Sequence, residues 1–504
     1  MKLIKYLIVL VSLLILGVVG VIVAVPRLAA MTFEVSAPAN TPAEDIVFIK
    51  FESLQSFPLK KVGTTQAGKQ LWRGRVSLRQ LGSPGGKLSY SYVRNNYHSY
   101  GTEYLPPERD NPEFPKHLPV ELRTVELKFG GKVNDAIERW RWFPADGEPA
   151  PAIPSTEATS ARVADRVKNE PFQAGVVLSD LWTDEYEIML EPTLKHLKAI
   201  GVNWLGIKPP WDFTEVDPLP KLENTRETVP GYPEDKLRLV IRQAKKFGFQ
   251  VYLEPQICCT EVQFENQSEQ WWGEFERQLH NWLDFHIKVA TSTGVDLMIL
   301  GPQRDIAAPV SVEMIWQKLF ERMRNEFPGK TALAGGLPEL GGEVLPTPSE
   351  AAPYLGLVDA IALEEWSELV PRINPTRDEV IGAVKQVFDQ QIEPFYQAVN
   401  LPIIMIAAYH AMSGAAMGTN APGTDELELG LVGPEKNLLS VVPLDLDTQA
   451  WIYDALLAEI AQRPYLIGFY PFGYAFIETR KDPGGIRGKP AEVLVSNWYQ
   501  AFGQ

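Results

Sequence analysis

The sequence predicts a multidomain protein with an N-terminal transmembrane helix, an all-β immunoglobulin-like sandwich and a C-terminal (β/α)₈ (TIM) barrel. Three observations favour this architecture: an uncharged apolar run near the N-terminus, then short runs rich in β-branched and aromatic residues, then apolar runs that alternate with helical stretches. The chain has 504 residues, which is too long for one ordinary domain and suits a barrel with a second domain.

Residues 1–30 predict a membrane anchor. The run from Tyr6 to Val25 carries no charged side chain, and about 20 such residues cross a bilayer as a helix. Lys2 and Lys5 precede the run, so the positive-inside rule predicts a cytoplasmic N-terminus and an extracytoplasmic C-terminal bulk. We expect an uncleaved single-pass anchor in the cell membrane. The alternative is a signal peptide cleaved near Leu28–Ala30, with secretion of the rest.

Residues 31–143 contain short strand-like runs between Pro, Gly and Asn clusters, which is the pattern of an all-β sandwich. Four segments together resemble a family 20 starch-binding module: TFEVSAPANTPAEDIVFI, LWRGRVSL, LSYSYVRNNYHSYGTEY and VNDAIERWRWFP. The resemblance implies the module's fold. The family places a glucan-binding Trp just after its second strand, where this chain reads FESLQSFPLKK without a Trp. We therefore expect a spacer or interdomain packing role rather than starch binding.

Residues 144–170 are rich in Pro, Ala, Ser and Thr and predict a partly extended linker. Residues 171–504 then alternate strand-like and helical stretches, which predicts a parallel barrel. The eight expected strands are FQAGVVL, NWLGIK, FQVYLEP, VDLMILG, KTALAGG, VDAIALEEW, LPIIMIAAY and LIGFYPFG. An open doubly wound sheet is the runner-up. No Gly-rich nucleotide fingerprint follows the first strand, so nucleotide binding is not favoured.

Polar and aromatic side chains follow the expected strands, where the functional residues of such barrels lie. Sugars offer hydroxyls for polar contacts and C–H faces for stacking on rings, so this mixture predicts a carbohydrate-binding cleft. Any barrel rim is polar because its loops are solvated, so the set as a whole supports the prediction better than any single residue. The substrate-binding candidates are Asp180, Trp182, Trp211, Asp212, Gln256, Gln303, Asp305, Trp366, Tyr409, His410, Tyr470 and Tyr474.

Five stretches of residues 171–504 carry a family resemblance: LKHLKAIGVNWLGIKPPW, AKKFGFQVYLEPQI, WLDFHIKVATSTGVDLMILGPQ, LPIIMIAAYHAMSGAA and GKPAEVLVSNWYQAF. Together they resemble glycoside hydrolase family 113, a β-mannanase-type family of retaining (β/α)₈ glycosidases. The resemblance implies hydrolysis of O-glycosyl bonds by two glutamates at the ends of strands four and seven. In that mechanism one is the acid/base and the other the nucleophile, about 5–5.5 Å apart.

The sequence departs from the family pattern at both catalytic positions. Strand four ends in Gly301-Pro302-Gln303 where the family reads roughly G-x-E, and an amide cannot exchange the required proton. Strand seven ends at Ala407, so a methyl group replaces the nucleophile. Gln256 stands where the family commonly has a histidine. We therefore expect a glycoside-hydrolase-like protein that binds carbohydrate without the retaining reaction.

Two alternatives remain open. The first is an active glycosidase that uses relocated carboxylates, with Glu254, Glu364 and Glu365 as catalytic candidates. A wider-spaced pair could run an inverting reaction through water. Because consecutive strand residues point in opposite directions, one of Glu364 and Glu365 should face the barrel mouth. The second alternative is a non-catalytic scaffold at the cell envelope that binds a protein through the barrel rim.

The amino-acid composition excludes some classes of binding partner. The net charge of −15 argues against nucleic acid, which needs clustered Lys and Arg. The two cysteines, Cys258 and Cys259, are adjacent, and no His-x-His or H-E-x-x-H spacing occurs, so we expect neither a metal nor another cofactor. The expected partners are a polysaccharide or oligosaccharide and, through the N-terminal helix, the membrane.

Overall fold

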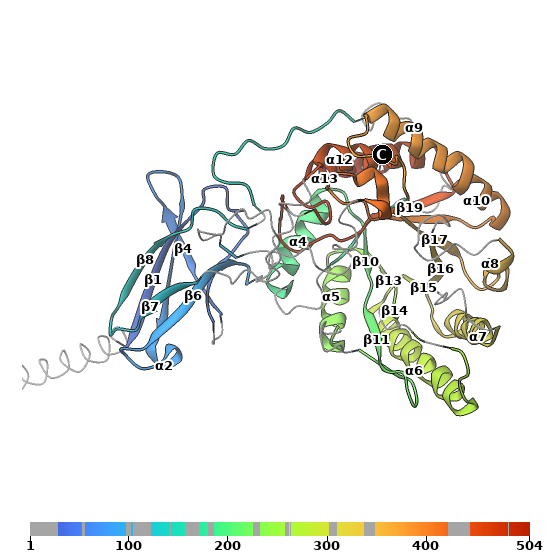
Figure 1. The fold of residues 1–504 in the computed structure, drawn as a ribbon, viewed down its shortest axis with the longest axis horizontal. Coiled ribbons are helices and arrows are strands. Elements are labelled where there is room, and N and C mark those ends of the chain that lie inside the picture. Colours follow the sequence, from blue (N-terminus) through green and yellow to red (C-terminus); the bar gives the residue numbers. More distant parts are fainter. Residues whose placement is uncertain are drawn as a thin grey trace, which may run out of the picture. The chain divides into compact units, whose positions relative to one another are not determined.

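The computed structural model describes residues 29–52, 56–96, 102–103, 122–141, 143–156, 171–179, 186–224, 232–257, 262, 264–301, 310–336, 348–421, 444–481 and 483–503. The chain divides into two compact units, whose described residues lie within 29–149 and 150–503. Figure 1 labels many of the elements of the two units.

Unit 1 is built from two four-stranded sheets, with strand orders β4-β5-β1-β8 and β3-β2-β6-β7. In the first sheet β1 pairs antiparallel with β5 and parallel with β8. The elements are β1 (Ala30–Ala37), β2 (Val47–Phe51), β3 (Ser56–Pro58), β4 (Lys60–Thr64), β5 (Gln70–Ser77), α2 (Leu78–Leu81), β6 (Lys87–Arg94), β7 (Arg123–Glu126) and β8 (Lys132–Ala136).

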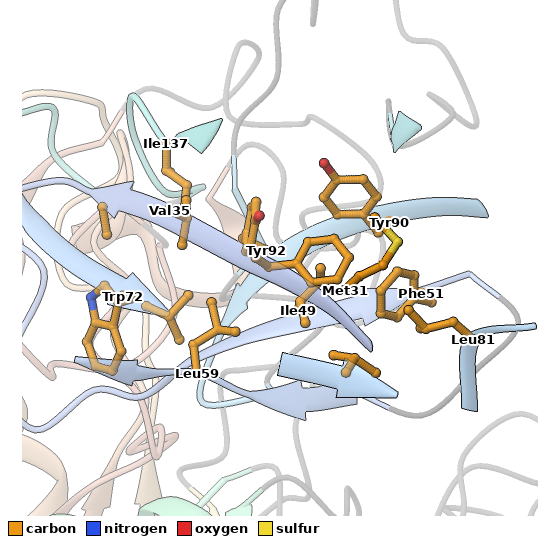
Figure 2. Close-up of a cluster of buried hydrophobic side chains, with 14 of the residues drawn as sticks. Met31, Val35, Ile49, Phe51, Leu59, Trp72, Leu81, Tyr90, Tyr92 and Ile137 are labelled. Atoms are coloured by element: carbon orange, nitrogen blue, oxygen red, sulfur yellow. The ribbon is translucent and has the colours of Figure 1, made fainter. Parts of the chain in front are cut away.

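The core of unit 1 lies between these two sheets. Val35 and Trp72 from the first sheet share one buried cluster with Ile49, Phe51 and Tyr90 from the second, as Figure 2 shows. In β1, buried positions alternate with half-buried ones, which is the period of a strand that covers a core on one face. The unit is therefore a sandwich whose two sheets are held together by interdigitated aromatic and branched side chains.

Unit 2 is a closed barrel of parallel strands in the order β9, β10, β13, β15, β16, β17, β18 and β19, which confirms the predicted (β/α)₈ barrel. Each of the eight expected sequence runs supplies one strand. Their bounds are β9 (Gln173–Val177), β10 (Trp204–Ile207), β13 (Gln250–Leu253), β15 (Leu297–Leu300), β16 (Lys330–Gly336), β17 (Ala360–Glu365), β18 (Ile403–Ala407) and β19 (Leu466–Pro471).

Helices follow the barrel strands and cover the outside of the barrel (Figure 1). A small sheet of β11 (Pro210–Glu215), β12 (Lys221–Glu223) and β14 (Gln256–Ile257) is separate from the barrel sheet. The helices are α4 (Tyr186–Ala199), α5 (Glu234–Lys246), α6 (Glu269–Thr293), α7 (Val310–Glu326), α8 (Pro348–Leu355), α9 (Arg377–Val387), the π-helix η1 (Phe388–Ile392), α10 (Glu393–Val399), the 3₁₀ helix η2 (Ala415–Asn420), α12 (Leu446–Gln462) and α13 (Pro490–Phe502).

Two tyrosine rings fill the barrel interior, and glycines on neighbouring strands make room for them. A Cβ on Gly175 would lie 2.0 Å from the ring of Tyr470, and one on Gly206 would lie 2.3 Å from that of Tyr252. The two rings meet edge to face, with centroids 4.9 Å apart. The interior below the strand ends is therefore packed with side chains, and a ligand has to bind above it.

The residues that the structure describes do not bear out the predicted transmembrane helix or the predicted single-pass membrane location. In the part of the chain that the structure describes, no helix is both long and apolar enough to cross a membrane. Helix α6 has 25 residues, but it carries charged side chains such as Glu274, Arg277 and Lys288. Ala30, which the prediction placed in the anchor, begins β1 and pairs with Ser77. The apolar run itself lies outside the described residues.

Candidate functional site

The inward-facing positions at the barrel mouth follow from the interior side chains. Trp204 on β10, Tyr252 on β13 and Ala362 on β17 all belong to the interior cluster. Because side chains alternate along a strand, the positions two or four residues further on also face inward. Lys208, Glu254 and Glu364 occupy these positions at the carboxyl ends of the three strands.

These three side chains form one ion cluster, which we call the mouth triad. The ammonium Nζ of Lys208 lies 3.0 Å from Glu254 Oε1 and also donates to Glu364 Oε1. Strands β10 and β17 are separated by three strands on either side of the barrel, so they lie opposite each other. The bond between Lys208 and Glu364 therefore crosses the barrel mouth.

The triad is buried at one end and open at the other. The side chains of Lys208 and Glu254 are each 5% exposed, whereas that of Glu364 is 52% exposed. Burial by itself would lower the pKa of Lys208, but attraction to Glu254 and Glu364 outweighs it and holds this pKa above its ordinary value. Lys208 is therefore a permanent cation. It cannot act as the neutral amine that a base or Schiff-base lysine requires.

Glu365, the neighbour of Glu364, faces away from the mouth and is fully buried. Its Oε1 accepts from the hydroxyl of Tyr409 at 2.7 Å, from the backbone N–H of Ser367 at 3.2 Å and from the Ser367 hydroxyl. Burial raises the pKa of Glu365, and the bonds from Ser367 and Tyr409 only partly oppose this. Of the three catalytic candidates, the structure brings Glu254 and Glu364 together and keeps Glu365 apart.

The ends of strands four and seven carry no carboxylate among the described residues. After β15 the described residues end at Gly301, so Gln303 and Asp305 lie outside the described residues. On β18 Ile404 and Ile406 face the interior, which turns Ala407 outward. Ala407 is fully buried, and its carbonyl accepts from the hydroxyl of Tyr453 at 3.1 Å. The inward position is that of Ala408, which also has only a methyl group.

All three predicted substrate-binding tyrosines are buried and hydrogen-bonded within the protein. Tyr409 bonds to Glu365, Tyr470 donates to Gln173 Oε1 at 2.8 Å, and Tyr474 donates to Glu492 Oε1 at 2.5 Å. At most 1% of each tyrosine is exposed. Sequence spacing places these residues near strand ends but gives no sign of which side of the barrel wall they occupy.

The other candidates divide into two groups. Trp211, Asp212 and Gln256 lie in the small sheet of β11 and β14, where the Trp211 ring packs on Phe285 and His286 of α6. Trp366 and His410, both half-buried, contact each other edge to face with ring centroids 5.0 Å apart. Burial lowers the pKa of His410 to about 4, and the nearby Lys489 adds to this, so its imidazole is neutral at pH 7. Asp180 and Trp182 lie outside the described residues.

Sequence reasoning missed two residues of the mouth, Lys208 and Phe472. Phe472 follows β19, is 40% exposed, and has its ring centroid 5.6 Å from Lys208 Nζ. Counting inward positions from Trp204 and Tyr470 reaches both residues. That count requires knowing which face of each strand is interior, and in a strand buried on both faces the sequence does not mark it.

The fold of the barrel is similar to that of solved glycoside hydrolase structures. A GH113 β-1,4-mannanase structure matches with a TM-score of 0.50 and 16% sequence identity, covering 66% of this chain and 99% of that chain. The GH113 β-mannanase of Alicyclobacillus acidocaldarius gives 0.48 and 18% over the same shares. The barrel is glycoside-hydrolase-like in fold. At such identities the similarity concerns fold alone.

No protein-family model matches the chain, and no curated protein sequence matches it. The predicted family 20 starch-binding module gains no support from any of the comparisons. Unit 1 is a sandwich of two four-stranded sheets.

Proposed function

We propose that the barrel binds a saccharide at its mouth and does not hydrolyse it by the retaining mechanism. The observation that carries this proposal is the mouth triad together with Ala408. Retaining hydrolysis needs a protonated acid and a free carboxylate about 5–5.5 Å apart across the sugar. Here Glu254 and Glu364 each direct an oxygen to the permanent cation Lys208, and the seventh strand presents a methyl group.

Saccharide binding is favoured by the mixture of groups around the triad. Phe472 and Trp366 expose part of their rings, and rings of this kind stack on the C–H faces of sugars. Glu364 offers acceptors and Lys208 a donor to sugar hydroxyls, while the neutral His410 can serve as either. The glycoside-hydrolase-like fold agrees with this proposal but does not by itself imply activity.

The alternative of relocated catalysis requires Glu254 and Glu364 to work as an acid/base pair. For this the Lys208 ammonium would have to leave its two partners, which places an unpaired charge in a buried site. Glu365 is buried behind the strand and does not reach a ligand in the mouth. The arrangement thus disfavours both versions of the relocated mechanism.

The test incubates the full chain with mannans, glucans and other α- and β-linked polysaccharides, and measures released reducing ends and retained protein together. We expect retention without release, with retention weakened in Phe472→Ala and unchanged in Phe129→Ala. Phe129 is a matched control because it is 66% exposed and belongs to unit 1.

Two other results would contradict the proposal. Release of reducing ends that disappears in Glu254→Gln or Glu364→Gln would establish relocated catalysis. Neither retention nor release on any polysaccharide would favour the protein-binding scaffold.

A further inference from the structure

The mouth triad carries an unbalanced negative charge. One ammonium faces two carboxylates, so the formal charge of Lys208, Glu254 and Glu364 is one negative. The imidazole of His410, on the neighbouring strand end, is neutral, and the ammonium of the nearby Lys489 donates to the carbonyls of Gly484 and Gly485. A surplus negative charge attracts a cation more strongly at a partly desolvated site than it would in bulk water.

The surplus charge is accessible at Glu364. Its Oε1 accepts from Lys208, whereas its Oε2 has no hydrogen-bond partner among the described residues. Half of this side chain is exposed, while Glu254 is buried. A ligand cation therefore has one carboxylate oxygen to pair with, on a side chain that is half exposed.

The ring of Phe472 adds a second attraction for a cation. Its centroid lies 5.6 Å from Lys208 Nζ, which is within the range of cation–π contacts, and 40% of the residue is exposed. A ligand ammonium near Glu364 Oε2 would have both a carboxylate and an aromatic ring within reach. A ligand carboxylate would instead approach two like charges.

The floor of the site holds an unpaired donor. The hydroxyl of Tyr252 is fully buried and has no hydrogen-bond partner in the described part of the barrel. It lies over Gly206, one inward position below Lys208, where a Cβ would be 2.4 Å from it. Glu254 and Glu364 are close enough to help raise the pKa of this phenol, after burial, so it remains a donor. It can contribute a hydrogen bond to a bound acceptor group.

We propose that the mouth selects a saccharide bearing a protonated amine, an amino sugar whose ammonium pairs with Glu364 Oε2 beside the ring of Phe472. This inference rests on the proposed saccharide-binding function and adds the chemical class of the ligand to it. A neutral sugar would leave the surplus charge uncompensated, and a uronic acid would increase it.

The test compares three β-1,4-linked tetramers that share a backbone and differ at carbon 2. These are the tetramers of glucosamine, N-acetylglucosamine and glucose, which carry an ammonium, an acetamide and a hydroxyl. Binding to the full chain is measured by calorimetry at about pH 6, where amines of this kind are protonated. We expect the glucosamine tetramer to bind up to about fivefold tighter than either neutral tetramer, because an ion pair with a half-exposed carboxylate contributes up to about 1 kcal/mol.

Three variants test which residues cause the preference for the glucosamine tetramer. Glu364→Gln should abolish the difference in affinity between the glucosamine and glucose tetramers, since an amide loses the charge that pairs with the ammonium. Glu326→Gln is the matched control. Its carboxylate is 46% exposed and pairs with Arg322 on α7, away from the strand ends. Phe472→Ala should weaken the glucosamine tetramer more than the glucose tetramer.

The outcomes separate this inference from the proposed function. Equal or tighter binding of a neutral saccharide, or a preference that survives Glu364→Gln, overturns the amino-sugar inference and leaves saccharide binding standing. Absence of binding by every saccharide in both experiments overturns the proposed function, and the inference falls with it.

Discussion

Two ion clusters in this protein have the same composition and different surroundings. Each consists of one cation between two carboxylates, and each links separate strands: β7 with β8 in the sandwich, and β10 with β13 and β17 in the barrel. The clusters are Arg123 with Glu103 and Asp135 in the sandwich, and Lys208 with Glu254 and Glu364 at the barrel mouth.

The sandwich cluster is surrounded by donors. Asp135 Oδ2 accepts from the hydroxyls of Tyr90 at 2.9 Å and Tyr92 at 2.8 Å, and Glu103 Oε1 accepts from the backbone N–H of Tyr92 at 2.9 Å. Arg123 lies on β7 of one sheet and Asp135 on β8 of the other. The surplus negative charge is thus spread over several hydrogen bonds, and the cluster cross-links the two sheets.

The mouth triad lacks such donors on its open side, because Glu364 is half exposed and its Oε2 has no partner within the described ranges. The difference teaches that formal charge alone does not assign a role to a buried ion cluster. Where protein donors satisfy every carboxylate, the cluster is structural. Where one carboxylate faces solvent, the same charges can serve recognition.

The largest expected effect comes from removing the cation of the mouth triad. Lys208→Met leaves the buried Glu254 without its ammonium, so we expect the free energy of unfolding to fall by about 3–5 kcal/mol. Urea denaturation followed by circular dichroism measures it. A loss below about 1 kcal/mol would mean that Lys208 is not the main charge partner of Glu254.

Removing the cation of the sandwich cluster should cost less. Arg123 is 21% exposed, so water can partly replace it, and Tyr90 and Tyr92 continue to donate to Asp135. We expect Arg123→Met to lower the free energy of unfolding by about 2 kcal/mol. The same urea denaturation experiment measures this loss. A larger loss than that of Lys208→Met would reverse the comparison.

The pH dependence of stability should reveal the buried carboxyl behind the mouth. The pKa of Glu365 is raised in the folded state, so its protonated form favours folding below the ordinary pKa. This contribution is lost as the pH rises through the raised pKa. Glu365→Gln should therefore lose less stability than the wild type as the pH rises above the ordinary glutamate pKa of about 4.3.

The control for this pH experiment is Glu364→Gln, which changes the adjacent, half-exposed residue of the same strand. Thermal unfolding across the pH series compares the two variants. A wild-type pH profile in Glu365→Gln would contradict the raised pKa.

The smallest expected effect on stability is that of Glu364→Gln itself. Its side chain is 52% exposed and Glu254 remains to pair with Lys208, so the free energy of unfolding should change by less than about 1 kcal/mol. The variant is thus suitable for the binding test. A loss comparable to that of Lys208→Met would make Glu364 a structural partner, like Glu103 in the sandwich.

The sequence predicts the positions of the barrel strands better than it predicts the roles of their side chains. Runs such as LMIL in β15 and IIMIA in β18 are apolar throughout, so their existence and order follow from composition and from the helical stretches between them. For the same reason these runs do not mark their interior face. Ala407 could therefore be placed at the end of strand seven but not turned outward, and Tyr470 and Tyr474 could not be distinguished from ligand-facing rings.

The sequence by itself determined the barrel and the order of its strands, because the periodicity of apolar residues is a local property. Only the tertiary structure decided that Lys208 meets Glu254 and Glu364. These residues are brought together when the sheet closes and places β10 opposite β17. An ion pair across a barrel depends on closure of the sheet and on which side chains of each strand face the interior. No single stretch of the sequence specifies either property.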